Sequence, residues 1–385
     1  MSGWRKTLDD LAEAGLLRRP LIIESRQGPR VRIDGADYLC FCSNNYLGLA
    51  GHPALAEAAK AAADQYGTGT GASRLVSGTM RIHRELEDAV VRFKGTEAAI
   101  VFPTGYMANV GTIQALVGRG DTVYCDRLNH ASIFDGCRLS GATLRVYPHR
   151  DVDRLRRLLG RKREGRALVV TDTVFSMDGD LAPLPDLAEV CERHGAMLML
   201  DEAHATGVLG ENGRGAAEHF GIEPGRVPVV MGTLSKAVGS LGGYVAGSRD
   251  LADLLVNKAR SFIYTTALPP AVCAASVAGL RIIEEEPERR AALWARTRQL
   301  HDGLRERGFD IGPTETPITP VIVGDSAQAV ELSQRLFEHH ILAPAIRPPT
   351  VPDGAARLRL TPMATHTAEN VQHVLAALAS QGRKL

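Results

Sequence analysis

The feature that most limits the possible folds of this chain is a series of short apolar runs between about residues 97 and 248, separated by stretches of helical periodicity. The runs are EAAIVF, DTVYC, ATLRVY, RALVVTDTVF, AMLMLDE, VPVVMGTL and GGYVAGS. Apolar runs of this length are typical of strands that are buried on both faces, and intervening helices favour parallel crossovers. We therefore predict an α/β fold with a mostly parallel central sheet and helices on both of its faces.

The flanking sequence indicates how the chain is divided. HPALAEAAKAAADQYG and MRIHRELEDAVVRFKG predict two helices that end at Gly67 and Gly95. After about residue 280 the pattern changes to charged helices, with strands at PITPVIV and RLRL, and the proline-rich residues 345–354 predict a rigid loop before the second of these strands. We expect an N-terminal segment (residues 1–50), a large domain (51–280) and a smaller α+β C-terminal domain (281–385).

Charge and cysteine content exclude several classes of protein. The 45 basic and 44 acidic residues give a formal net charge of +1, which offers no large field for nucleic acid or for an anionic membrane. The six cysteines include no C-x-x-C pair, which argues against a disulfide framework or a zinc site. The first residues carry acids where a secretory signal needs an apolar stretch, and about 18 consecutive apolar residues occur nowhere. We expect a soluble cytoplasmic protein that acts on small molecules, without metal.

Two familiar motifs occur here in the wrong context. MLMLDEAHATG resembles the magnesium-binding strand of a DEAH-type ATPase, but the chain has no Gly-Lys dipeptide and therefore no phosphate loop of that kind. GTGTGA, residues 67–72, resembles a dinucleotide fingerprint, but it follows a helix instead of a strand. A nucleotide-dependent enzyme is therefore only a remote alternative.

A lysine among small residues, Lys236 in GTLSKAVGSLGGY, carries the strongest chemical signal. A lysine that forms a Schiff base must lose its proton near neutral pH, and burial among small apolar groups favours this loss. Asp201, which ends an apolar strand, is suited to pair with a pyridine nitrogen and to keep it protonated. Either residue alone is more often a surface lysine or a strand-end cap. Together they indicate pyridoxal phosphate chemistry.

Eight segments in order along the chain resemble those of the α-oxoamine synthases, a family with the fold type I (aspartate aminotransferase-like) architecture of pyridoxal-phosphate-dependent transferases. The segments are SNNYLGLAGHP, GASRLVSGT, FPTGYMAN, DRLNHASI, DTVFSMDGDLAPLPDL, DEAHATGVLG, FIYTTALPP and AIRPPTVPDGAARLRLT, and TLSKAVGSLG resembles the family's lysine motif. The resemblance covers nearly the whole chain. It implies the same fold and pyridoxal 5'-phosphate as the cofactor.

The resemblance also implies roles for individual residues. It makes Lys236 the Schiff-base lysine, Asp201 the partner of the pyridine nitrogen, and His130 the group that stacks on the ring and touches the acyl substrate. It places His204 and Ser176 on the ring's phenolic oxygen. Further contacts, to the cofactor phosphate, are implied for Gly105, Tyr106, Thr233, Thr265 and Thr266, the last two from a neighbouring subunit of a homodimer whose active site lies between the chains.

On the substrate side, the resemblance implies that Arg359 and Asn44 bind the amino-acid carboxylate, with Arg347 as the other candidate. A fork of donors suits a carboxylate because it binds both oxygens. Arg18 and Thr350 would line the entrance for the acyl-CoA. The segments FIYTTALPP and AIRPPTVPDGAARLRL most resemble the biotin-pathway branch of the family, which joins L-alanine to pimeloyl-CoA. The alternative within the family is a glycine-using ligase of acetyl-CoA.

Overall fold

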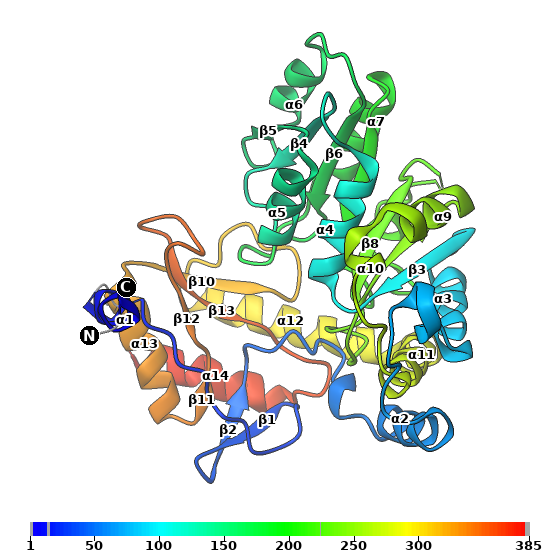
Figure 1. Cartoon of the computed structure of the whole chain (residues 1–385). Helices are drawn as coiled ribbons and strands as arrows, with labels where there is room; N and C mark the ends of the chain where they lie inside the picture. Colours follow the sequence, from blue (N-terminus) through cyan, green and yellow to red (C-terminus); the bar gives the residue numbers. More distant parts are fainter. Residues whose placement is uncertain (1–2, 14–15, 224, 382–385) are drawn as a thin grey trace.

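The computed structural model of the chain describes residues 3–13, 16–223 and 225–381 (Figure 1). Its centre is a seven-stranded sheet with the strand order β3-β9-β8-β7-β6-β4-β5. The strands are β3 (Ala98–Phe102), β4 (Thr122–Asp126), β5 (Thr143–Tyr147), β6 (Ala167–Asp172), β7 (Met197–Asp201), β8 (Val229–Thr233) and β9 (Gly243–Gly247). β9 runs antiparallel to both of its neighbours, and the other pairs are parallel. The predicted mostly parallel α/β sheet is confirmed.

Helices cover both faces of this sheet because its strands alternate apolar side chains between two cores. Leu168, Val170 and Met199 face one core, and Val169 and Leu198 face the other. The first core is closed by α4 (Gly105–Leu116), α5 (Ala131–Ser140), α9 (Arg249–Lys258) and α10 (Arg260–Ile263). The second is closed by α2 (Pro53–Tyr66), α3 (Arg81–Lys94), α6 (Val152–Leu159), α7 (Leu184–Arg193), α8 (Ala216–His219) and α11 (Pro270–Glu285). Near-complete burial of these side chains is the main stabilising contribution.

The second lobe contains strands from both ends of the described chain. One small sheet has the order β10-β13-β12, formed by β10 (Thr319–Gly324), β12 (Ala345–Ile346) and β13 (Ala356–Leu360). The other joins β1 (Arg30–Ile33) and β2 (Ala36–Cys40) to β11 (Ile341–Leu342). Helices α12 (Glu288–Glu306), α13 (Ser326–Glu338) and α14 (Ala368–Ser380) pack on these sheets, and Figure 1 shows β1 and β2 beside this lobe and apart from the large sheet.

The remaining short elements are α1 (Gly3–Glu13), the 3₁₀ helix Leu49–Gly51 and the π-helical turn Arg74–Gly78. The proline-rich segment differs slightly from expectation, because its first two residues form β12 instead of loop. All six cysteines are free thiols. Within the described residues, no helix combines the length and the apolar character needed to cross a membrane.

Candidate active site

Lys236 follows β8 by three residues, and its amine lies inside the protein at the carboxyl edge of the large sheet. Its Nζ atom is 2.8 Å from Nε2 of His204. Burial lowers the pKa of Lys236 to about 8, against the opposing charges of Asp201 and Asp172. The sequence around Lys236 contains no acid, so these two carboxylates reach it only through the fold. The amine can therefore lose its proton close to neutral pH, as a Schiff-base nucleophile must.

His204 connects the lysine to the N-terminal segment. Its Nδ1 atom is 2.6 Å from the hydroxyl oxygen of Tyr46. Burial and the neighbouring Lys236 hold the pKa of His204 well below its ordinary value, so the imidazole is neutral at pH 7. Burial also raises the pKa of Tyr46 to about 12, so the phenol keeps its proton. The neutral imidazole adds no positive charge beside the amine, so the lowered pKa of Lys236 comes mainly from its own burial.

Asp201 and His130 are connected through two residues that the sequence analysis missed, Asn109 and Ser132. The amide nitrogen of Asn109 donates to Oδ2 of Asp201 at 2.7 Å and to Oγ of Ser132 at 2.9 Å. That hydroxyl lies 2.7 Å from Nδ1 of His130. Asn109 and Ser132 lie inside FPTGYMAN and DRLNHASI, so their presence in these segments was the available signal. The network orients a buried carboxylate and an imidazole face toward the same space.

The backbone of His130 is held by a second buried carboxylate, that of Asp172. The N–H of His130 donates to Oδ2 of Asp172 at 2.7 Å. Asp172 pairs with Asp201 in the register of β6 and β7, and burial together with the Asp201 charge raises its pKa well above the ordinary value. In contrast, burial lowers the pKa of His130, and the Asp201 charge acts in the opposite direction. The His130 side chain is exposed in the single chain, so one flat face is open to a ligand.

The start of α4 lies next to the end of β8. Thr104 caps α4 by accepting a hydrogen bond from the N–H of Met107, so the first-turn N–H groups that can face an anion are those of Gly105 and Tyr106. A Cβ atom added at Gly105 would lie 3.5 Å from Oγ1 of Thr233, so these two residues border the same space. The Thr233 hydroxyl donates to the Gly242 carbonyl at 2.8 Å.

Tyr106, Thr265 and Thr266 make contacts within the single chain. The Tyr106 hydroxyl donates to Oδ2 of Asp135 at 2.6 Å, on the surface. Thr265 and Thr266 follow α10, and Thr266 forms a bridge with Ser73, which directly precedes the π-helical turn. The expectation that they contact the cofactor phosphate of a neighbouring subunit stays a prediction.

Arg359, on β13 of the small lobe, reaches the site together with Asn44. Its Nη2 atom donates to Oδ1 of Asn44 at 3.0 Å, and its Nε atom donates to the Ser176 carbonyl at 2.5 Å. Arg359 is 7% exposed. The predicted pairing of Arg359 with Asn44 is therefore present, and Ser176 joins it through its backbone. Arg347 directly follows β12 and is half-buried. Thr350 and Arg18 are exposed.

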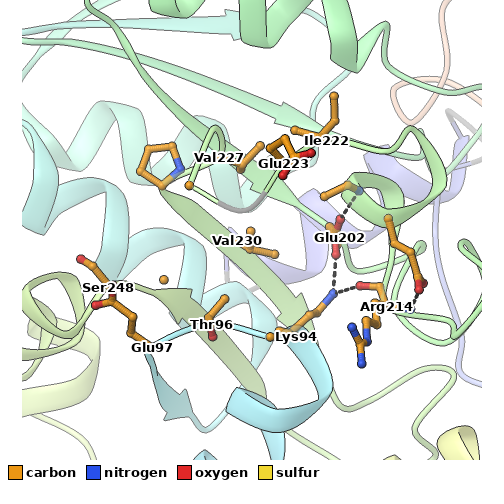
Figure 2. A pocket seen from close by; sticks show the side chains of 16 residues that line it. Lys94, Thr96, Glu97, Glu202, Arg214, Ile222, Glu223, Val227, Val230 and Ser248 are labelled. Carbon is orange, nitrogen blue, oxygen red and sulfur yellow. Dashed lines mark hydrogen bonds and ion pairs between the residues drawn. The ribbon is translucent and has the colours of Figure 1, made fainter.

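A cavity of about 510 Å³ lies beside the C-terminal end of α3 and is separate from the residues described above (Figure 2). Lys94 and Glu202 form a buried ion pair in it, and Lys94 also donates to the Arg214 carbonyl. The other carboxylate oxygen of Glu202 accepts from the N–H of Ala216 at 2.8 Å. Because these buried charges already bind each other and the backbone, they leave no strong group for a cofactor. We assign this cavity no part in the chemistry.

The ion pair in this cavity leads to a prediction about stability. Lys94→Met should lower the free energy of unfolding by about 3–5 kcal/mol, because it leaves the Glu202 carboxylate buried without its partner. The matched control is Lys60→Met, which removes an exposed ion pair with Glu57 and should cost about 0–1 kcal/mol. Urea-induced unfolding measures both. Equal losses in the two variants would mean that the buried pair contributes no more than a surface pair.

This chain is similar in sequence to proteins of a known family. Residues 36–378 match the family of class I and II aminotransferases. Curated relatives include the 8-amino-7-oxononanoate synthases of Symbiobacterium thermophilum, which is 52% identical, and of Geobacter sulfurreducens, which is 53% identical; each match covers 98% of this chain and 97% of the relative.

Solved structures agree with this relationship. A serine palmitoyltransferase from Sphingomonas wittichii superposes with a TM-score of 0.94 at 38% identity, covering 99% of this chain and 97% of that one. An 8-amino-7-oxononanoate synthase from Francisella tularensis superposes with a TM-score of 0.79 at 29% identity, covering 89% and 97%. A structure of SPT (serine palmitoyltransferase) with PLP (pyridoxal phosphate) superposes with a TM-score of 0.94 at 37% identity, again over 99% of this chain and 97% of that one.

Proposed function

This chain belongs to the class I and II aminotransferase family, and we propose that it performs the reaction of the 8-amino-7-oxononanoate synthases, the decarboxylating condensation of L-alanine with a pimeloyl thioester in biotin biosynthesis. The products are 8-amino-7-oxononanoate, CoA and CO2. The observation that carries this proposal is the arrangement of Lys236, His204 and Asp201 beside a helix N-terminus, in a chain about half identical to such synthases over almost its full length.

The residues present fit pyridoxal 5'-phosphate. The start of α4 and the space between Gly105 and Thr233 suit the phosphate, because helix N–H groups favour an anion. Asn109 and the N–H of Ala203 already orient the Asp201 carboxylate, which would pair with the ring nitrogen. Lys236 would hold the cofactor, and His130 would cover one face of the ring. When bound, the cofactor supplies an electron sink beside Cα of the amino acid.

The protein side chains then have separable tasks. Arg359 and Asn44 bind and orient the alanine carboxylate. The free Lys236 amine would remove the proton from Cα, for which an amine with a pKa near 8 is suited. His130 lies where it can contact the acyl group as the new carbon–carbon bond forms and the CoA thiolate leaves. Asp201 keeps the ring nitrogen protonated throughout, and His204 stays neutral beside the Lys236 amine.

One observation favours a second amino acid, serine, because the serine palmitoyltransferase structures superpose better than the synthase from Francisella tularensis. Superposition reports the course of the backbone, whereas substrate choice depends on a few side chains. The 52–53% identity to the curated synthases, compared with 37–38% to the palmitoyltransferases, therefore has more weight for the substrate.

The test of the function is CoA release with a panel of amino acids (alanine, glycine, serine) and thioesters (pimeloyl, acetyl, palmitoyl). Alanine with pimeloyl-CoA should give the highest kcat/KM. A methyl group in an apolar niche is worth about 1–3 kcal/mol, so glycine should retain measurable activity. Higher kcat/KM for glycine with acetyl-CoA, or for serine with palmitoyl-CoA, would overturn the named reaction and leave the family unchanged.

We also propose a homodimer in which Thr265 and Thr266 approach the partner's cofactor phosphate. An exposed apolar patch adjoins them: Tyr264 is 71% exposed and Val76 is 80% exposed, and the Ser73–Thr266 bridge connects their two segments. Large exposed apolar side chains gathered in one place favour a protein interface. The six free thiols and the acyl-CoA substrate suit the reducing cytoplasm, where we place the reaction.

Substitution of Arg359 tests the carboxylate assignment. Arg359→Lys should raise KM for alanine by about 10–100-fold, because a point charge replaces a fork that binds Asn44 and the carboxylate together. The matched variant is Arg347→Lys, for which KM for alanine should change little. Steady-state kinetics at saturating thioester distinguishes the two. If Arg347→Lys shows the larger rise, the carboxylate is bound by Arg347 instead.

A further inference from the structure

We propose that His149 is a positioning residue for this reaction: its imidazolium bridges Asp126 and Asp180, and thereby holds together the turn that carries His130 and the turn that carries Ser176. This inference depends on the proposed function for its kinetic consequences, but not for its structural ones. His149 follows β5 and belongs to none of the motifs to which the sequence analysis gave a role.

Each ring nitrogen of His149 contacts a different carboxylate. Its Nδ1 atom lies 3.1 and 3.2 Å from the two carboxylate oxygens of Asp126, and its Nε2 atom lies 2.8 Å from Oδ2 of Asp180. The ring meets Phe175 edge-on, with centroids 4.3 Å apart. The His149 side chain is 17% exposed, and each carboxylate is 2% exposed. The register of β4 and β5 pairs Asp126 with Tyr147, which brings the residues after both strands together.

Each aspartate belongs to a turn next to the active site, Asp126 through its carboxylate and Asp180 through its backbone. Asp126 ends β4, and its oxygens accept from the N–H groups of Leu128 and Arg150, at 2.8 Å each. The turn that begins there leads within four residues to His130. On the other side, the N–H of Phe175 donates to the Asp180 carbonyl at 3.1 Å, which closes the turn containing Ser176. Ser176 in turn accepts from Arg359. His149 therefore connects the turn that leads to His130 with the turn whose Ser176 carbonyl holds Arg359.

Two carboxylates on one imidazole require a proton on both ring nitrogens. Burial lowers the pKa of His149, but the hydrogen bonds and charges of Asp126 and Asp180 outweigh it and raise the pKa to about 9. The other charged groups here are Arg150, whose Nη1 is 3.2 Å from Oδ2 of Asp180, and Glu315, which is 3.9 Å from Arg150. Burial and the Asp126 charge raise the pKa of Tyr147, which stays neutral.

The sign of the pH dependence follows from this shift. Because the folded-state pKa lies above the ordinary value near 6.5, the stabilisation is fully present below about pH 6.5 and is lost as the pH rises through about 9. Above that pH, a neutral imidazole donates to one carboxylate only, and one of the two turns loses its support. Displacing a catalytic group by about 1 Å can cost about 10²-fold in rate.

The experiment compares His149→Gln with His301→Gln in the full-length protein. His301 is a buried histidine of the small lobe, bonded to Thr319 Oγ1 at 2.9 Å, and serves as a control for the loss of a buried imidazole. Hydrogen exchange of the cofactor-free protein at pH 8 should become faster in both turns, residues 126–130 and 175–180, for His149→Gln and in neither for His301→Gln. This measurement requires no substrate, so it stands even if the named reaction is wrong.

Kinetics and titration complete the test. The wild type should lose kcat/KM above about pH 9, as His149 deprotonates, and the imidazole resonance should titrate with a pKa of about 9. His149→Gln should be about 10–100-fold slower at pH 8 and should lack that limb of the profile. If His149→Gln fails to fold, Asp180→Asn should lower the pKa of His149 and loosen the same turns. Unchanged exchange in the two turns, or a pH profile identical to the wild type, would overturn the proposal.

Discussion

Lys236→Ala should abolish covalent attachment of pyridoxal phosphate and reduce kcat by at least about 10²–10⁴-fold, the range expected for losing a positioned acid–base group. Lys236 is the one residue with both assigned tasks, binding the cofactor and moving the Cα proton, so neither task survives its removal. Its amine has a pKa near 8 and lies 2.8 Å from the neutral His204. No other lysine was assigned to this site.

The measurement is the visible spectrum, followed by borohydride reduction and peptide mapping. The wild type should be yellow and should carry the reduced cofactor on the peptide containing Lys236. The matched control is Lys258→Ala, at the exposed end of α9, which should leave both results unchanged. Cofactor fixed to a different lysine, or a colourless wild type that binds ATP instead, would contradict the assignment.

Asp201→Asn should retain the shape of the site and lose most of the activity. A neutral amide cannot stabilise a protonated ring nitrogen as a carboxylate does, and removing one such electrostatic group typically costs about 10²–10³-fold in kcat. The substitution also disturbs the hydrogen bond from Asn109, because two amide nitrogens cannot donate to each other. Cofactor attachment through Lys236 should remain.

Single-turnover kinetics of Cα proton exchange, measured with deuterated alanine, isolates the step in question. The exchange rate should fall in parallel with kcat for Asp201→Asn. Asn109→Ala, which leaves the carboxylate charged but removes one donor, should give an intermediate rate. An unchanged exchange rate in Asp201→Asn would show that Asp201 is not the partner of the ring nitrogen.

Six of the seven strands of the large sheet could be predicted from sequence because both of their faces are buried, which favours short apolar runs, whereas the edge strand β5 is largely exposed. Strand order could not, since the same runs are compatible with several arrangements. The proximity of Asp172 to Asp201 depends on β6 lying next to β7. Sequence patterns could not show this proximity before the sheet was assembled, although the Asp172 charge acts on the pKa of Lys236 against the effect of burial.

Site residues were predictable where they lie in a recognisable motif. They were not predictable where their role depends on contact with a residue far away in the sequence. Lys236, Asp201 and His204 lie within short segments that carry chemical meaning. Tyr46, Asn109 and His149 act through partners from 23 to 158 positions away. Such pairs depend on helix phase and on strand register across the fold, which no local pattern reveals. The expected phosphate contact of Tyr106 is through its backbone N–H at the start of α4 and stays a prediction, while its hydroxyl bonds to Asp135.

The pairing of β2 with β11 has a consequence for how the chain reaches this state. Leu39 pairs with Ile341, so one small sheet cannot close until nearly the whole polypeptide has been synthesised. Contacts between residues so far apart in sequence form slowly, because the entropy of closing the loop is lost before any pairing is gained. Until then, β1 and β2 form an edge with unsatisfied backbone groups, which favours association with other chains. Yield of the native protein should therefore depend on chaperones or on low temperature during synthesis.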